Sequence, residues 1–386
     1  MKKSLMLLCA IACVCACAPK SGLTKSGIDP KDFESEYEGR PTALYTLTNA
    51  SGMEVCITNF GGRIVSVMVP DREGEFKDVV LGFDKVSDYF PENNATDFGA
   101  AIGRYANRIA QGQITIDGVQ YQLPQNNFGH CLHGGPTGWQ YKVYEAVEAD
   151  ESHLKLKMVS PDGDNNFPGE VTAFVTYTLT DCNAIDIRYE ATTTAPTVIN
   201  MTNHSYFNLG GDPTATILGH RLKINADNFT PVDSTYMTTG VIAPVAGTPM
   251  DFTACKLVGE EIDNYDFDQL RNGNGYDHNW CLNTAGDDSA PALVLFCPET
   301  GIVLTEYTDE PGVQVYSGNF LDGTVTGKKG IVYNQRTGIC IETQKYPDTP
   351  NKSEWPSALL RPGQTYTSHC VFAFGVKDGE CCCCQK

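Results

Sequence analysis

Within residues 198–208, side chains that can bind a ligand or transfer a proton occur at every second position. They are Asn200, Thr202, His204, Tyr206 and Asn208. Successive side chains of a β-strand point to opposite faces, so a strand here places these amide, hydroxyl, imidazole and phenol groups on one face. Such a face is suited either to plain exposure to solvent or to a carbohydrate, whose hydroxyls need hydrogen-bond partners and whose C–H faces pack on rings.

A second strand-like segment, residues 338–344, carries one carboxylate among apolar residues. Glu342 faces away from Ile339 and Ile341 if the segment is a strand. A glutamate flanked by β-branched residues is unusual in strands, and it is either a functional group or an exposed or paired one. Gln314 has a similar place in residues 312–316, opposite Val313.

Two glycine-containing segments gather further polar groups. Residues 103–109 contain Arg104 and Arg108, which are either ligand-binding residues or ordinary surface charges. Residues 130–135 contain His130 and His133, but no third metal ligand follows at a useful spacing. The sequence therefore predicts no metal site.

The elements that must position these groups are predicted to be β-strands. Ile114 and Ile116 alternate with polar residues, Asp117-Gly118 is typical of a hairpin turn, and alternation resumes after it. Two further runs with alternating apolar residues follow at 171–179 and 185–189. No interdomain linker interrupts residues 42–377, so we expect one large antiparallel β-sandwich with few, short helices.

The charge balance excludes some classes of function. The chain of 386 residues has 28 Lys+Arg against 47 Asp+Glu, a formal net charge of −19, and no basic run. Binding to nucleic acid, which needs phosphate neutralisation, is not expected.

The N-terminus has the layout of an exported lipoprotein. Lys2 and Lys3 precede an apolar run that is too short to span a bilayer, and Val14-Cys15-Ala16-Cys17 is similar to a bacterial lipobox. We expect residues 1–16 to be a signal peptide and Cys17 to be lipidated, with the body facing the periplasm and touching the membrane only through this anchor. Cys13 is a weaker alternative for the lipidated residue. A further alternative is an ordinary signal peptide, cleaved or uncleaved, without lipidation. Residues 17–41, rich in polar residues, are predicted to be a flexible tether.

The sixteen cysteines fall into three groups. Four lie in the leader, four form the run 381–384, and eight are scattered singly through the body. Those in the body sit mostly in apolar runs, which favours buried free thiols. The tail 378–386 is predicted to be disordered, with binding of a soft metal as an alternative.

Several motifs in order make the chain resemble the aldose 1-epimerase (galactose mutarotase) family. They comprise Asn59-Phe60-Gly61-Gly62, residues 103–112, Leu132-His133-Gly134-Gly135, residues 202–209, Asp277-His278-Asn279, residues 312–316 and residues 342–348. The resemblance covers nearly the whole body and implies a large antiparallel β-sandwich. It differs from the cytoplasmic family members in the lipoprotein leader and the cysteine-rich tail.

The resemblance implies an enzyme that interconverts the α and β anomers of free hexoses such as galactose and glucose, with no cofactor and no metal. By this resemblance Glu342 is the general base and His204 the general acid. Ring opening needs one proton to leave the anomeric hydroxyl and another to reach the ring oxygen, and the roles reverse on closure. The positions that match sugar-binding residues are Asn107, Arg108, His133, Tyr206, Asp277 and Gln314.

Three other functions remain open from the sequence. A non-catalytic sugar-binding lipoprotein would lack the acid or the base, although both His204 and Glu342 are present. A protein for sugar phosphates would need extra cations, for which Arg104 and Arg108 form the one close pair in the loop. A glycoside hydrolase would need two carboxylates across the bond, such as Asp277 and Glu342.

Overall fold

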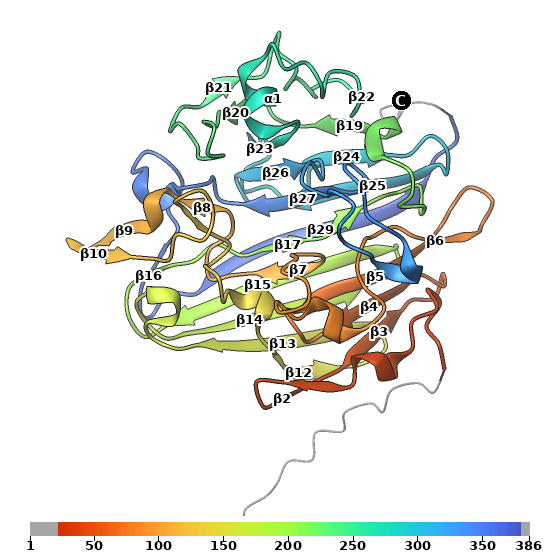
Figure 1. Cartoon of the computed structure of the whole chain (residues 1–386), viewed down its shortest axis with the longest axis horizontal. Coiled ribbons are helices and arrows are strands. Elements are labelled where there is room, and N and C mark those ends of the chain that lie inside the picture. Colours follow the sequence, from red (N-terminus) through yellow and green to blue (C-terminus); the bar gives the residue numbers. More distant parts are fainter. Residues whose placement is uncertain (1–21, 380–386) are drawn as a thin grey trace, which may run out of the picture.

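The computed structural model describes residues 22–379, whose regular elements are nearly all antiparallel strands joined by loops (Figure 1). The predicted signal peptide, the lipidation residue Cys17 and most of the tail 378–386 lie outside the described residues.

One layer is a nine-stranded antiparallel sheet. In β14 (Val171–Leu179) every second residue is buried, as the alternation in the sequence predicted. The order of its strands is β12 (Glu145–Ala149), β13 (His153–Ser160), β14, β15 (Ala184–Thr193), β29 (Tyr366–Val376), β25 (Ile302–Thr308), β24 (Leu293–Phe296), β19 (Arg221–Ile224) and β22 (Lys256–Leu257).

The second layer combines smaller sheets. A six-stranded sheet has the order β18 (Tyr206–Phe207), β27 (Ile339–Gln344), β26 (Gly312–Tyr316), β23 (Asp277–Cys281), β20 (Asn228–Thr230) and β21 (Ala243–Pro244). A four-stranded sheet contains β3 (Leu44–Thr48), β4 (Glu54–Thr58), β5 (Arg63–Pro70) and β6 (Phe76–Asp78). Between them β17 (Thr202–His204) pairs with β7 (Ala100–Ile102), at the centre of Figure 1.

Short pairs and helical turns complete the described chain. The pairs are β1 (Ser35–Tyr37) with β2 (Arg40–Thr42), β8 (Arg108–Ile109) with β11 (Cys131–Leu132), β9 (Gln113–Ile116) with β10 (Val119–Gln122), and β16 (Thr197–Val198) with β28 (Leu359–Leu360). The one α-helix within residues 22–379 is α1 (Asp268–Gly273). The 3-10 turns are η1 (Pro30–Phe33), η2 (Val86–Tyr89), η3 (Ala110–Gly112), η4 (Trp139–Tyr141), η5 (Asp164–Asn166), η6 (Ile217–Gly219), η7 (Lys328–Gly330) and η8 (Thr349–Asn351).

The two layers share one apolar core, which determines where the site lies. Val175 and Tyr189 of the nine-stranded sheet and Val313 and Ile341 of the six-stranded sheet belong to the same buried cluster. Each such side chain contributes roughly 1.5–3 kcal/mol by leaving water. Because neighbours along a strand alternate, Gln314 of β26 and Glu342 of β27 lie on the face away from this core.

The expectation of a flexible tether over residues 17–41 is wrong for residues 22–41. This segment contains η1, β1 and most of β2, and it buries Ile28 and Phe33, with relative exposures of 2% and 0%. Phe33 belongs to a second apolar cluster that also contains Phe60 and Tyr89. Burial of these side chains, with Tyr37 packed against the same cluster and Arg40 bonded to the Val143 carbonyl, holds the segment against the body.

Two further findings bear on the N-terminal and cysteine expectations. No helix within residues 22–379 has the length and apolar character needed to cross a bilayer. Seven body cysteines are free thiols, and all but Cys182 are buried, as expected. Cys255 differs in being disulfide-bonded.

Candidate active site

His204 and Glu342 come from neighbouring strands whose register brings them together. His204 ends β17, opposite Ala100 of β7. The chain then continues into β18, where Tyr206 pairs with Cys340 of β27, two residues before Glu342. The predicted single strand is thus two short strands separated at Ser205, yet the rings of His204 and Tyr206 remain stacked, with centroids 5.2 Å apart.

The polar face predicted for residues 198–208 is not exposed to solvent. Asn200, Thr202, His204, Tyr206 and Asn208 are all buried. Asn208 has a structural role, because its Nδ2 donates to the carbonyls of Ala215 and Thr337. The protein therefore encloses this face, and plain exposure to solvent does not explain its polar residues.

The imidazole and the carboxylate form a close, buried pair. His204 Nε2 lies 3.6 Å from Glu342 Oε1, and the two side chains are only 6% and 2% exposed. Burial, together with the negative charges of Asp277 and Asp97, raises the pKa of Glu342 to about 7, against the opposing effect of the His204 and Arg108 charges. A carboxylate with a pKa near neutrality can both accept and return a proton.

Asp277 and Gln314 form a hydrogen-bonded pair beside Glu342. They lie on adjacent strands β23 and β26, and Gln314 pairs directly with Glu342 of β27. Gln314 Nε2 donates to Asp277 Oδ1 at 2.7 Å. Burial raises the pKa of Asp277, while the positive charge of Arg108 and the bond from Gln314 oppose the rise.

Asn107 in the loop before β8, Arg108 at the start of β8 and His133 directly after β11 lie close together, because β8 pairs with β11. Asn107 and His133 have positive φ of 63° and 50°. The Asn107 N–H donates to His133 Nδ1 at 3.2 Å, and the Arg108 N–H donates to Asn107 Oδ1 at 2.7 Å. The His133 ring lies 5.1 Å from that of His204.

These contacts define the chemical state of His133. Burial and the neighbouring His204 and Arg108 lower its pKa well below the ordinary value. Because its Nδ1 accepts a backbone N–H, the neutral ring carries its proton on Nε2 and offers a donor.

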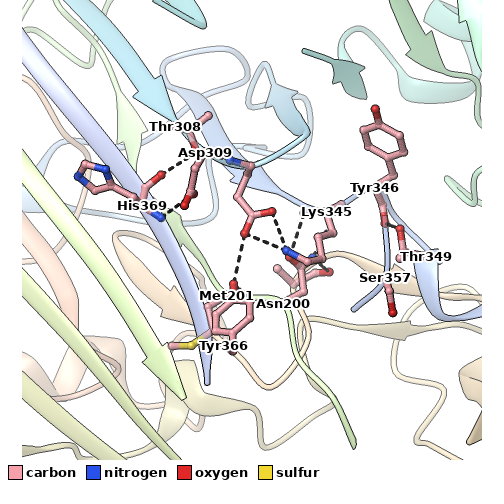
Figure 2. Close-up of polar contacts among 12 residues, drawn as sticks. Asn200, Met201, Thr308, Asp309, Lys345, Tyr346, Thr349, Ser357, Tyr366 and His369 are labelled. Carbon is pink, nitrogen blue, oxygen red and sulfur yellow. Dashed lines mark hydrogen bonds and ion pairs between the residues drawn. The ribbon is translucent and has the colours of Figure 1, made fainter. Parts of the chain in front are cut away.

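Asn200 links the segment before Arg108 to the end of the strand that carries Glu342. Figure 2 shows Asn200 beside Lys345, to which it is hydrogen-bonded. Its Oδ1 accepts the Lys345 N–H at 3.0 Å, and its Nδ2 donates to the Ala106 carbonyl at 3.3 Å. Lys345 follows β27 directly and its Nζ contacts both carboxylate oxygens of Glu310, at 3.2 and 3.0 Å. The Tyr366 hydroxyl donates to Glu310 Oε1 at 3.5 Å, so a buried polar network supports the end of β27.

The remaining arginine of the loop has a structural role. Arg104 is 2% exposed, and its Nη1 donates to the carbonyls of Pro168 and Gly169, while Nη2 donates to Ser160 Oγ. Burial lowers its pKa to about 10. The interpretation of Arg104 as a surface charge is therefore wrong, and its donors are not offered to a ligand beside Arg108.

Two groups of possible metal ligands overlap at the site, namely Asp97 with His133 and His204, and His204 with Cys340 and Glu342. In the first, the proton on His133 Nε2 opposes coordination. In the second, burial raises the pKa of Cys340 well above its ordinary value, whereas metals bind the thiolate. His130 has both ring nitrogens engaged, by the Gln111 N–H and by Thr235 Oγ1.

Three residues near the candidate site belong to none of the motifs that the sequence shows. Asn127 Oδ1 accepts from Arg108 Nε at 3.1 Å, and the Tyr236 ring lies 5.2 Å from the Arg108 guanidinium. Asp97 has a carboxylate oxygen near both His133 and His204. All three stand in irregular loops, where no periodicity indicates which way a side chain points.

Comparisons with known proteins agree in one family. The profile of the family described as aldose 1-epimerase matches residues 43–373. A mouse (Mus musculus) protein named galactose mutarotase is 43% identical over 324 residues, which cover 84% of this chain and 92% of that protein. An Escherichia coli K12 protein named aldose 1-epimerase is 38% identical over 339 residues, covering 87% of this chain and 96% of that protein.

Solved structures give the same result. A structure of an aldose epimerase homologue from C. elegans has a TM-score of 0.79 and 31% identity, covering 87% of this chain and all of that one. A galactose 1-epimerase from Lactobacillus acidophilus has a TM-score of 0.77 and 28% identity, covering 89% and 97%.

Proposed function

The chain belongs to the aldose 1-epimerase family, and from this premise we infer that it interconverts the α and β anomers of free aldoses with Glu342 as base and His204 as acid. The observation that carries the assignment of roles is the buried pair of these two side chains, 3.6 Å apart. The hydroxyl that loses a proton and the ring oxygen that gains one are bonded to the same carbon, so the two groups that serve them must lie close together.

The proposed reaction needs only the two protein groups. Glu342 removes the proton of the anomeric hydroxyl, the bond between the anomeric carbon and the ring oxygen breaks, and the ring oxygen takes a proton from His204. The anomeric carbon becomes an aldehyde, which rotates about its bond to the next carbon. In closure protonated Glu342 returns its proton to the aldehyde oxygen and His204 takes back the one from the hydroxyl.

The sugar is proposed to be held by hydrogen bonds from residues around this pair. Arg108 and His133 offer N–H donors, while Asp277, already bonded to Gln314, offers a carboxylate acceptor. Asn107 and Tyr206 complete the proposed set. Arg108 and His133 are 6% exposed and Asp277 is 8% exposed, so bound hydroxyls would exchange water for protein partners in a nearly dry site.

Galactose is the proposed substrate because several relatives, including those of mouse and pig, are named galactose mutarotase. The test is polarimetry of freshly dissolved α-galactose and α-glucose with the purified protein. We expect the approach to anomeric equilibrium to accelerate in proportion to protein concentration. A rate equal to that of buffer alone, with a protein shown to be folded, would exclude the function.

Other readings have less support. A sugar phosphate would need a second cation beside Arg108, but Arg104 is engaged by backbone carbonyls. A glycoside hydrolase would oppose two carboxylates, whereas the group that faces Glu342 at 3.6 Å is an imidazole. A purely sugar-binding protein would not need the acid–base pair.

We also propose that the protein is exported and anchored by lipid at Cys17, with its body in the periplasm. The support comes from the sequence: a charged start, a short apolar run and the lipobox-like residues 14–17. One acyl chain binds membranes weakly, so firm attachment requires multiple acylation.

A further inference from the structure

Asp97 brings an additional carboxylate to the acid–base pair. It stands three residues before Ala100, the β7 residue that pairs with His204. One of its carboxylate oxygens lies within 4.8 Å of a ring nitrogen of His133 and of His204. None of the motifs found in the sequence includes this residue.

The backbone around Asp97 is fixed on both sides. Arg63, with 0% exposure, donates from Nη2 to the Thr96 carbonyl at 3.1 Å and from Nη1 to the Phe98 carbonyl at 2.9 Å. The Gly99 N–H donates to the His204 carbonyl at 3.0 Å. The position of the Asp97 side chain relative to His204 therefore results from a rigid frame, which a specific contact requires.

The carboxylate retains unused hydrogen-bonding capacity. Asp97 Oδ1 is buried and accepts no hydrogen bond from any residue within 22–379. Asp97 also lines a cavity of about 250 Å³ together with Tyr206, which belongs to the proposed sugar-binding set, while His204 and Glu342 lie outside the lining of this cavity. A buried carboxylate oxygen without a donor is costly, and the hydroxyl of a sugar that enters beside His204 supplies one.

The neighbouring groups limit what else Asp97 can do. The negative charge of Asp97 acts on the acid–base pair of Glu342 and His204, since it is one of the causes that raise the pKa of Glu342. Glu342 is nevertheless the carboxylate 3.6 Å from His204, so Asp97 is not needed as a second base. A metal site is opposed by the proton on His133 Nε2 described above.

We propose that Asp97 is a specificity-determining residue, whose carboxylate accepts a hydrogen bond from one hydroxyl of the aldose and thereby favours sugars that carry this hydroxyl over the corresponding deoxy sugar. The inference rests on the proposed function, since it concerns the sugar bound at that same site.

The experiment is a double-mutant cycle between protein and substrate. Polarimetry compares the wild type and Asp97→Ala on galactose and on its 2-, 3-, 4- and 6-deoxy forms, which keep the anomeric hydroxyl and the ring oxygen. Asp97→Asn keeps an acceptor oxygen and should recover part of the loss. Asp287→Ala is the matched control, because Asp287 is exposed, bonds Ser289 within its own turn and does not line this cavity. Thermal unfolding verifies that each variant is folded.

We expect Asp97→Ala to lower kcat/KM for galactose about ten- to a hundredfold, chiefly through KM, as for loss of a hydrogen bond to a charged group. For the one deoxy sugar that lacks the bound hydroxyl, Asp97→Ala should have no effect, and Asp287→Ala should match the wild type on every sugar.

Equal losses on all the sugars, or a shifted pH profile with unchanged KM, would overturn the proposal, since Asp97 would then act on the acid–base pair. A wild type inactive on every sugar would instead contradict the proposed function itself.

Discussion

Glu342 and His204 face each other at 3.6 Å in a site from which water is largely removed, and this single contact accounts for most of the proposed chemistry. A correctly placed acid or base contributes about 10²- to 10⁴-fold in rate. We expect Glu342→Gln and His204→Asn each to lose that much by polarimetry on α-galactose. Because both groups serve one transfer event, the double variant should lose less than the product of the two.

The exposed glutamate Glu299 offers a control for this experiment, since Glu299→Gln should have the wild-type rate. In the wild type, kcat/KM should rise with pH through about 7, where Glu342 ionises and becomes a base. Folded single variants as fast as the wild type would exclude the assignment, and strictly multiplicative losses would mean that the two groups act in separate steps.

The same residue predicts a conflict between catalysis and stability. The pKa of Glu342 is about 7 in the folded protein against 4.5 when unfolded, so the folded state holds the proton more tightly. The free energy of unfolding therefore falls as pH rises from about 4.5 to 7, by about 3 kcal/mol. Glu342→Gln, which resembles the neutral acid, should exceed the wild type by about this amount in urea unfolding at pH 8, and the difference should shrink as the pH approaches 4.5.

At the scale of elements, the end of β27 depends on a buried ion pair. Glu310 is 2% exposed, and its carboxylate contacts Lys345 Nζ at 3.0 Å. Lys345→Met removes the cation and leaves a buried carboxylate without its partner, which should cost about 3–5 kcal/mol. Restoring neutrality with Glu310→Gln in the same chain should recover part of this loss.

The surface pair of Arg361 and Asp117, with side chains 42% and 53% exposed, is the matched control. Arg361→Met should cost about 1 kcal/mol or less by the same measurement. Equal costs for Lys345→Met and Arg361→Met would show that the buried pair does not support β27.

The strands were predictable where periodicity and turn chemistry agree. The Asp117-Gly118 hairpin is formed by β9 and β10, and both turn residues have positive φ, 51° and 82°. The alternation of 171–179 gives β14, and the motif residues converge on one face because adjacent strands carry them. Asp97 and Asn127 were not predictable, because loop side chains follow no period. Likewise, only the tertiary structure shows that Phe33 is buried.

For the molecule as a whole, the proposed lipid anchor determines where the enzyme works. Replacing Cys17 by Ser removes the thiol that would be acylated, so we expect the protein to move from the membrane to the soluble periplasmic fraction. Cell fractionation with immunoblotting measures this, and Cys182→Ser, at the exposed free thiol, is the control. A wild-type protein found in the soluble cytoplasm would contradict both export and anchoring.

The place of β29 in the nine-stranded sheet has a consequence for biosynthesis. Its partners β15 and β25 lie on either side of it, yet β29 is the last strand along the described chain. The nine-stranded sheet thus stays in two parts until residues 366–376 have left the ribosome, because nothing earlier in the order fills the gap between β15 and β25. Folding is therefore delayed relative to synthesis. A chain whose largest sheet is not yet joined is easier to unfold than the finished domain, which suits passage through a channel in the proposed export.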